Sequence, residues 1–408
     1  MCLLALVPAG CAPTAQPVEL SDDVALAGAG SVTIHVLLQP EHGRYRQRYM
    51  RGAASAVEVF AATFGRFDHV ALELDDPAWA PSSSDESVAA EPRFHWWTTS
   101  TAFQPELAAA RAVVRRGIDA RFGRSAVPHW FLDGVAEWVA RRAVVPLFEK
   151  ENLPPGFAFI ENRYFDAFVP RFARIRLPVD TAGWPVAAYR RNPAAAPVPV
   201  AAASDRAALA GKTILALGTL EQWLGQPTLN AVMAGLFEQG DNAGLPQFER
   251  LASAASGQDL TWFFEPVFHS AARFDYAIGA HATRLEQDGS FITTVTVERK
   301  GDATFTGSNA PRVGPYDRGL GIALQVTFAD GQTRIDRWDG RDPRRTFRYR
   351  SPASATTAVV DPEHVVLLDI GQTNNSATFA EPSSQPLEWA ARFLMWLSDA
   401  LVTYAALV

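Results

Sequence analysis

Three polar side chains recur at intervals of four residues: His129, Asp133 and Glu137. On an α-helix this spacing places all three on one face. Imidazole and carboxylate groups are ligands that divalent metals accept, so the three could hold a metal ion together with His95. We favour the alternative of ordinary helix contacts, in which Glu137 pairs with Arg141 one turn later and His129 lies in the exposed first turn.

The histidines exclude a metallopeptidase helix of the H-E-x-x-H type, which needs two histidines four residues apart. No two of the eight histidines have that spacing; they are His35, His42, His69, His95, His129, His269, His281 and His364. The G-x-S-x-G turn of a serine hydrolase is also missing. Gly211-Lys212-Thr213 is not a phosphate-binding loop, because Arg206 stands where such a loop needs its first glycine.

The bulk composition is that of a globular protein of about two domains. Of 408 residues, 48% are apolar and 20% are charged, and the formal net charge is −7. The arginines are scattered and form no basic block, so we expect no nucleic-acid partner. Both cysteines, Cys2 and Cys11, lie at the amino terminus, which leaves the rest of the chain without a disulfide or a thiolate metal site.

The first residues, MCLLALVPAGCAPTAQP, resemble a bacterial lipoprotein signal. A short apolar run, Leu3 to Val7, leads to Ala9-Gly10-Cys11, and a polar spacer completes the segment 1–16. The resemblance implies that Cys11 is lipidated and that the protein is anchored at the bacterial cell envelope, on the periplasmic or outer face. The run is too short to cross a bilayer. The alternative is a frayed apolar terminus.

The pattern of apolar residues predicts a mainly helical first domain with a small sheet, over residues 17–280. Strands are expected at 31–38 and 69–74, with an aromatic strand at 94–99. Residues 150–205 are rich in proline and alanine and should form loops and short helices. The predicted helices are 44–64, 105–122, 128–142, 207–224, 227–238, 245–256 and 259–269.

A β-sandwich domain is expected over residues 281–378, because short β-rich runs alternate there with turn dipeptides. The turns are Asp288-Gly289, Asp330-Gly331 and Asp339-Gly340. The runs are 291–299, 321–328, 333–338, 346–350, 356–360 and 365–370. An amphipathic helix is predicted over 385–408, and its apolar face must be covered by the protein itself, a membrane surface or a partner. That face carries Phe393, Leu397, Leu401, Tyr404 and Val408.

The segment Trp130–Trp138, W-F-L-D-G-V-A-E-W, resembles the W-L-N/D-E-G-F-A-E-Y segment of the membrane alanyl aminopeptidase family, the gluzincin zinc aminopeptidases. Further segments follow that family's order: Phe64-Gly-Arg-Phe67, Gly211-Lys212 with Leu215 to Glu221, and Asp259 to Phe264. The resemblance covers most of residues 40–378. It implies an α+β, gluzincin-like fold, with a mainly helical catalytic-type domain, a β-sandwich domain and a carboxy-terminal helix, but without the family's amino-terminal β-saddle.

The H-E-x-x-H helix of that family, which lies about twenty residues before this segment, has no counterpart here. By the family spacing its positions fall on Ala110, Arg111 and Val114; shorter connections place them on Arg115, Arg116 and Asp119 or on Arg116, Gly117 and Ala120. No alignment supplies a histidine. Because a zinc hydrolase needs three protein ligands around an open position, we expect no zinc and no other cofactor.

Other family positions differ too. The ligand glutamate corresponds to Asp133, and the oxyanion-stabilising tyrosine corresponds to Ala210. The strand that grips the substrate amine should lie near residues 92–99, where the sequence is P-R-F-H-W-W-T-T. The resemblance therefore implies a catalytically degenerate member.

Three functions remain open. The first, which we favour, is a lipid-anchored scaffold that binds a peptide or protein partner; the residues that could line its cleft are Trp96, Trp97, His129, Trp130 and Asp133. The second is a residual hydrolase, or metallopeptidase, with a non-standard site around Asp133 and Glu137. The third is an accessory subunit of a membrane transporter assembly, which the family resemblance allows. For the tryptophans, including Trp138, we favour a place in the core over a place in the cleft.

Overall fold

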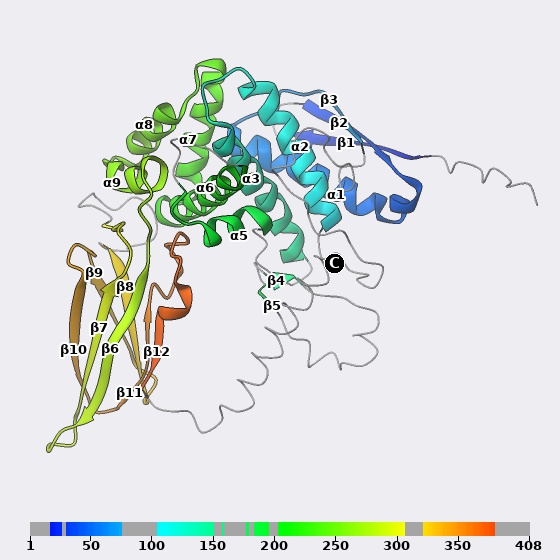
Figure 1. The fold of residues 1–408 in the computed structure, drawn as a ribbon. Coiled ribbons are helices and arrows are strands. Elements are labelled where there is room, and N and C mark those ends of the chain that lie inside the picture. Colours follow the sequence, from blue (N-terminus) through cyan, green and yellow to red (C-terminus); the bar gives the residue numbers. More distant parts are fainter. Residues whose placement is uncertain are drawn as a thin grey trace, which may run out of the picture.

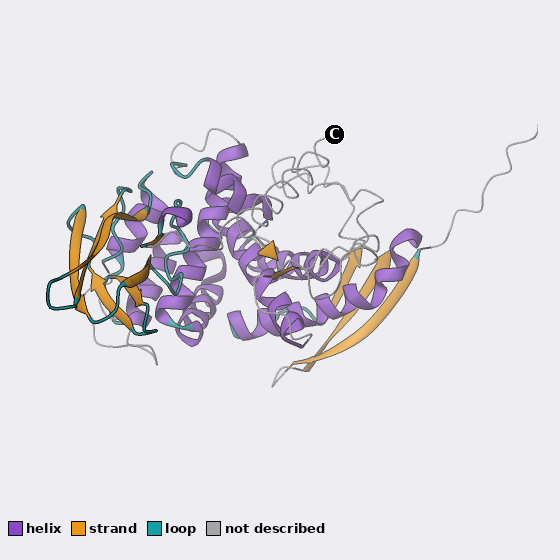
Figure 2. Ribbon diagram, turned by 90° about the horizontal axis from the view of Figure 1, so that it is seen from below, coloured by secondary structure: helices purple, strands orange, loops and turns teal. Residues whose placement is uncertain are grey.

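The computed structural model describes residues 17–26, 30–75, 104–150, 157–158, 177–178, 183–195, 203–306 and 321–379. Within these ranges the chain has an α+β fold. A sheet of three strands lies at one end of a group of helices, and two further sheets lie at the other end (Figures 1 and 2). Several predicted features fall outside the described residues: Cys11, the strand at 94–99 with His95, Trp96 and Trp97, and the helix at 385–408.

The first sheet has the order β1(Val18–Leu26)-β2(Gly30–Leu38)-β3(Ala71–Asp75). β1 pairs with β2 in the antiparallel sense, and β3 pairs with β2 in the parallel sense. Alternate residues of β2 are buried, as the sequence predicts; these are Val32, Ile34, Val36 and Leu38. The sheet packs on α1(Arg46–Phe64). β1 was not predicted, because only Val24 of its nine residues is fully buried.

The remaining helices of the first region are close to prediction. They are α2(Gln104–Phe122), α3(His129–Lys150), α5(Gly183–Arg191), α6(Ala203–Leu224), α7(Gln226–Gln239), α8(Leu245–Ser256) and α9(Thr261–Phe264), which continues as a π-helical turn over Glu265–His269. The prediction that α3 ends near residue 142 is wrong. The helix continues through Pro146 because Ala143, Val144 and Leu147 extend its buried face, and this packing offsets the cost of a proline.

The core of the helical region is built around α3, which lies between α2 and α6 (Figure 1). α1 packs on both α2 and α3. Close approach of α1 and α2 depends on Gly52, because a Cβ there would collide with the backbone of Glu106. In the expected loop region the structure describes α5, two short paired strands, β4(Phe157–Ala158) and β5(Leu177–Pro178), and the beginning of α6.

The second region consists of two antiparallel sheets that face each other. One has the order β10(Arg344–Ser351)-β7(Phe291–Arg299)-β6(Tyr276–Leu285), and the other has the order β12(Ser376–Thr378)-β11(Ala355–Val360)-β8(Ile322–Phe328)-β9(Thr333–Trp338). Aromatic contacts join them, including Phe328 with Tyr349 and Tyr276 with Trp338. All three predicted turn glycines have positive φ, between 69° and 81°.

Two details of this region differ from prediction. β6 begins at Tyr276, so the sheets start a few residues before the expected boundary at 281. Residues 365–370 form no strand; only Asp369 makes an isolated bridge, with Phe274. The reason is that the buried Asp361 carboxylate accepts the backbone N–H groups of Val365 and Val366, which curls the chain into a turn.

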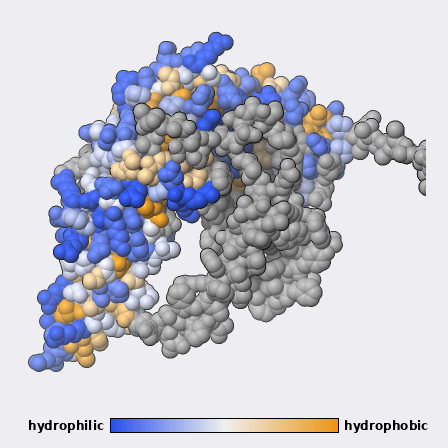
Figure 3. Space-filling view, in the orientation of Figure 1, coloured by the Kyte–Doolittle hydropathy of each residue, from blue (hydrophilic) through white to orange (hydrophobic). Residues whose placement is uncertain are grey.

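The two regions meet through α5, α6 and the segment after β11. The Tyr189 hydroxyl donates to the Leu368 carbonyl at 2.9 Å, and the Leu367 N–H donates to Thr219 Oγ1 at 3.1 Å. Among the described residues, no helix has the length and apolar character needed to cross a membrane. On the face shown in Figure 3, hydrophilic residues dominate the described surface and apolar residues occur in small groups.

Candidate functional site

Helices α2 and α3 face each other through a ladder of ion pairs. Nε and Nη2 of Arg111 donate to the two carboxylate oxygens of Glu137, both at 2.7 Å. One turn along, Nη1 of Arg115 donates to Asp133 Oδ1. The two helices run antiparallel. Moving four residues forward on α2, from Arg111 to Arg115, therefore corresponds to moving four residues back on α3, from Glu137 to Asp133. The two helices are neighbours, and Asp133 is directed between them.

Asp133 is held from two sides. Its side chain is only 6% exposed. Oδ1 accepts from Arg115 of α2, while Oδ2 accepts from Nε and Nη2 of Arg206 of α6 at 2.9 and 2.8 Å. Both carboxylate oxygens are therefore engaged by guanidinium groups that belong to different helices.

Gly134 explains how α6 comes close enough to supply Arg206. A Cβ at position 134 would lie 2.8 Å from the Ala210 carbonyl oxygen and would collide with the Thr213 side chain. Only glycine permits this separation between α3 and α6. The glycine that follows Asp133 in the sequence thus sets the helix contact that neutralises Asp133.

Glu137 is held in a similar way. Besides the two bonds from Arg111, Oε1 accepts from Arg141 at 2.6 Å, which confirms the predicted pair one turn apart. Burial alone would raise the pKa of Glu137, but the charges and hydrogen bonds of Arg111 and Arg141 outweigh it and lower the pKa to about 2. Glu137 is therefore a fixed anion at neutral pH. We call Arg111, Arg115, Arg141 and Arg206 the arginine cluster.

The ladder ends at Asp119 and His129. Burial raises the pKa of Asp119, and Asp133 raises it further, while the charges of Arg115 and His129 lower it. His129 is the first residue of α3 and is exposed, as the sequence predicts. Among the described residues, no three His, Cys, Asp or Glu side chains group closely enough to hold a metal ion.

Of the three α2 positions that the family spacing gives, Arg111 pairs with Glu137, whereas Ala110 and Val114 do not face the carboxylates. Ala110 and Val114 are completely buried in the core. Arg111 and Arg115 both face α3, and they are four residues apart, as the two histidines of an H-E-x-x-H helix are. Two guanidinium groups thus lie opposite the carboxylates of Asp133 and Glu137.

These side chains do not fit a zinc ion. Zinc accepts thiolate, imidazole or carboxylate ligands. A guanidinium group stays protonated and has no lone pair to offer. Both oxygens of Asp133 and both of Glu137 accept hydrogen bonds from arginine, so the carboxylates are engaged as well.

The candidate cleft aromatic that the structure describes lies in the core. Trp130 is 7% exposed and contacts Phe131 and Phe268, with ring centroids 6.0 Å apart in each case. Trp138 is also buried and lies beneath the Arg142 guanidinium. Both positions agree with the alternative that placed the tryptophans in the core.

Lys212 has a structural position. It is almost fully buried, and its Nζ donates to the carbonyl oxygens of Pro266 and Ser270 at 3.0 and 3.3 Å. These carbonyls lie at the π-helical turn that precedes the second region, so the ammonium group ties α6 to that turn. Burial lowers the pKa of Lys212 to about 8.

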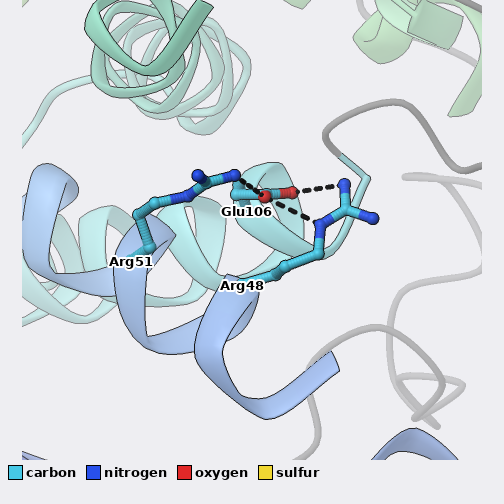
Figure 4. Close-up of polar contacts among 3 residues, drawn as sticks. All are labelled: Arg48, Arg51 and Glu106. Carbon is cyan, nitrogen blue, oxygen red and sulfur yellow. Dashed lines mark hydrogen bonds and ion pairs between the residues drawn. The ribbon is translucent and has the colours of Figure 1, made fainter. Parts of the chain in front are cut away.

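A further buried carboxylate was missed by the sequence analysis. Glu106, in the first turn of α2, accepts two hydrogen bonds from Arg48 and one from Arg51, both on α1 (Figure 4). Its side chain has no exposed surface. The available signal was weak: two arginines three residues apart on one helix, and a glutamate at the start of another.

No protein-family model matches the chain, and a search of curated proteins found no relative. Among solved structures, the chain is similar to aminopeptidase A of Legionella pneumophila, crystallised in complex with aspartic acid. The TM-score is 0.47 and the sequence identity is 13%. The match covers 82% of this chain but only 36% of the length of that aminopeptidase.

Proposed function

We propose that this protein is a catalytically degenerate relative of the zinc aminopeptidases and works as a binding scaffold for a peptide or protein. One observation carries the proposal: arginine side chains hold the carboxylates of Asp133 and Glu137, which correspond to the acidic positions of the family segment. The alternative hydrolase would need one of them as a general base. A carboxylate with a pKa of about 2 is a poor proton acceptor at neutral pH.

The first test measures zinc and activity together. Purified protein should contain no stoichiometric zinc and should not cleave aminoacyl reporter substrates. Adding a chelator should leave the melting temperature unchanged, because a metal bound to the native state would stabilise it by mass action. Zinc near one equivalent per chain that survives dialysis would contradict the proposal.

A designed variant asks whether the two arginines of α2 are what prevents zinc binding. Arg111→His/Arg115→His would place two imidazoles four residues apart opposite Asp133 and Glu137, and these are ligand types that zinc accepts. We expect the double variant to bind zinc where the wild type does not. Arg116→His, on the exposed side of α2, is the matched control. Equal zinc uptake by wild type and double variant would count against this explanation.

The proposed place of action is the bacterial cell envelope, with Cys11 lipidated and the segment 385–408 in contact with a membrane surface or a partner. The apolar run before Cys11 and the apolar face of the segment support this. Cys11→Ser should release the protein from the membrane fraction. Unchanged membrane recovery, with no lipid mass on the amino-terminal peptide, would contradict the anchor.

A further inference from the structure

We propose that the arginine cluster binds an oxyanion, the carboxylate or phosphate group of a small ligand, and that Arg115 is its main contact. The inference rests on the proposed function in one respect, since it assumes that no zinc lies between α2 and α3. Four guanidinium groups lie around the carboxylates of Asp133 and Glu137, and Asp119 lies near Arg115.

The hydrogen bonds single out Arg115. Arg111 and Arg206 each turn the Nε–Nη2 edge of the guanidinium group toward a carboxylate. Arg115 instead donates through Nη1 alone, and among the described residues its Nε and Nη2 have no hydrogen-bond partner. That edge is the pair of parallel donors that matches a carboxylate or phosphate.

Arg115 is also accessible and held in place. Its side chain is 38% exposed, while the Asp133 carboxylate to which it is bound is 6% exposed. Asp133 is fixed in turn by Arg206 from α6, whose side chain is 28% exposed. Because the guanidinium group is already oriented, a ligand would lose little conformational freedom in binding to it.

The pair of arginines at Glu106 serves as an internal comparison. Arg48 is a partly exposed arginine on a buried carboxylate, as Arg115 is, but it uses its Nε–Nη2 edge to bind Glu106. The donor edge that an oxyanion would need is therefore occupied at Arg48 and available at Arg115. For this reason we assign the ligand to the arginine cluster.

The test is titration calorimetry on the chelator-treated full chain at low ionic strength. The probes are inorganic phosphate and a tripeptide with a free carboxy terminus, with the same tripeptide amidated as the control. We expect saturable binding of phosphate or of the free tripeptide, and none of the amidated one. Which of the two binds identifies the source of the oxyanion.

Variants locate the binding. Arg115→Gln should weaken it by at least about tenfold, which corresponds to one charge-assisted hydrogen bond. Arg115→Lys keeps the charge beside Asp133, and with it the fold, but loses the paired donors, so it should also weaken binding. Arg116→Gln makes the same change of charge at the next, exposed position and should have no effect.

Two results would overturn the inference: no saturable binding of either oxyanion probe, or equal weakening by Arg115→Gln and Arg116→Gln. Its failure can be distinguished from failure of the proposed function. Zinc-free protein that binds neither probe contradicts only the oxyanion site, whereas stoichiometric zinc contradicts the scaffold proposal itself.

Discussion

The helical region and the paired sheets use ion pairs differently. In the helical region, three carboxylates that each contact two arginines are largely shielded from solvent, with Glu106, Asp133 and Glu137 at 0%, 6% and 11% exposure, although exposed pairs such as Arg66–Asp68 occur there too. In the sheets, pairs such as Arg284–Glu286 and Arg341–Asp339 leave both partners substantially exposed. The same pairing of charges therefore occurs in two different environments.

The difference indicates what each kind of pair can do. An exposed pair gains little, since water and salt screen it. A buried pair must offset a large desolvation cost, so it adds little net stability compared with apolar residues but becomes expensive to break. The main effect of the buried pairs is therefore on helix packing. They determine how α1, α2, α3 and α6 are rotated relative to one another and which side chains come into contact.

The largest effect is expected at Glu106. Arg48→Ala/Arg51→Ala would leave a fully buried carboxylate without either guanidinium group, at a cost of about 3–5 kcal/mol in the free energy of unfolding. Denaturant unfolding monitored by circular dichroism would measure it. A loss smaller than about 1 kcal/mol would mean that the buried pair matters no more than a surface pair.

The next effect concerns Glu137 and pH. Its pKa in the folded protein, about 2, is below the ordinary value of 4.5. The resulting stabilisation, about 3 kcal/mol, is present in full above pH 4.5 and is lost as the pH falls toward 2. Glu137→Gln should therefore destabilise the protein at pH 7, and the gap to wild type should narrow by pH 3. A gap that stays constant would contradict this account of Glu137.

A smaller, opposite pH dependence is expected from Lys212. Its pKa in the folded protein is about 8, below the ordinary 10.5, so the folded state binds the proton less tightly than the unfolded state. Stability should rise as the pH increases through this range, by about 1.5 kcal/mol between pH 8 and about 9.5. Lys212→Met should remove that rise. The same slope in wild type and variant would assign it to another group.

The smallest effect is expected in the sheets. Arg284→Ala and Arg341→Ala each remove one partner of an exposed pair, and each should change the free energy of unfolding by less than about 0.5 kcal/mol. Measured by the same denaturant unfolding, these two variants are the matched controls for Arg48→Ala/Arg51→Ala. Losses similar to those in the helical region would remove the contrast between the two environments.

Much of the fold could be predicted where one local pattern dominates. The helices at 105–122 and 128–142 and the turn glycines follow from periodicity and turn chemistry. β1 was missed because Ser21, Asp22 and Asp23 interrupt its apolar alternation, and its strand pairing with β2 compensates for that. The extension of α3 past Pro146 was missed because packing outweighed a local signal to stop.

For the candidate site, the sequence by itself determined which side chains are present and which of them share one face of a helix. The spacing of four residues puts Asp133 and Glu137 on one face of a helix, and the histidine positions leave no H-E-x-x-H helix. The pair Glu137–Arg141 also follows from that spacing, since both residues are on the same helix.

Only the tertiary structure decided which arginines reach the carboxylates. Arg115 meets Asp133 because of how α2 is rotated against α3, and Arg206 meets it because Gly134 lets α6 approach. The contact between Arg206 and Asp133 joins residues 73 positions apart in the chain. Helix periodicity is set by the local backbone, but the rotation and separation of neighbouring helices depend on packing across the whole core.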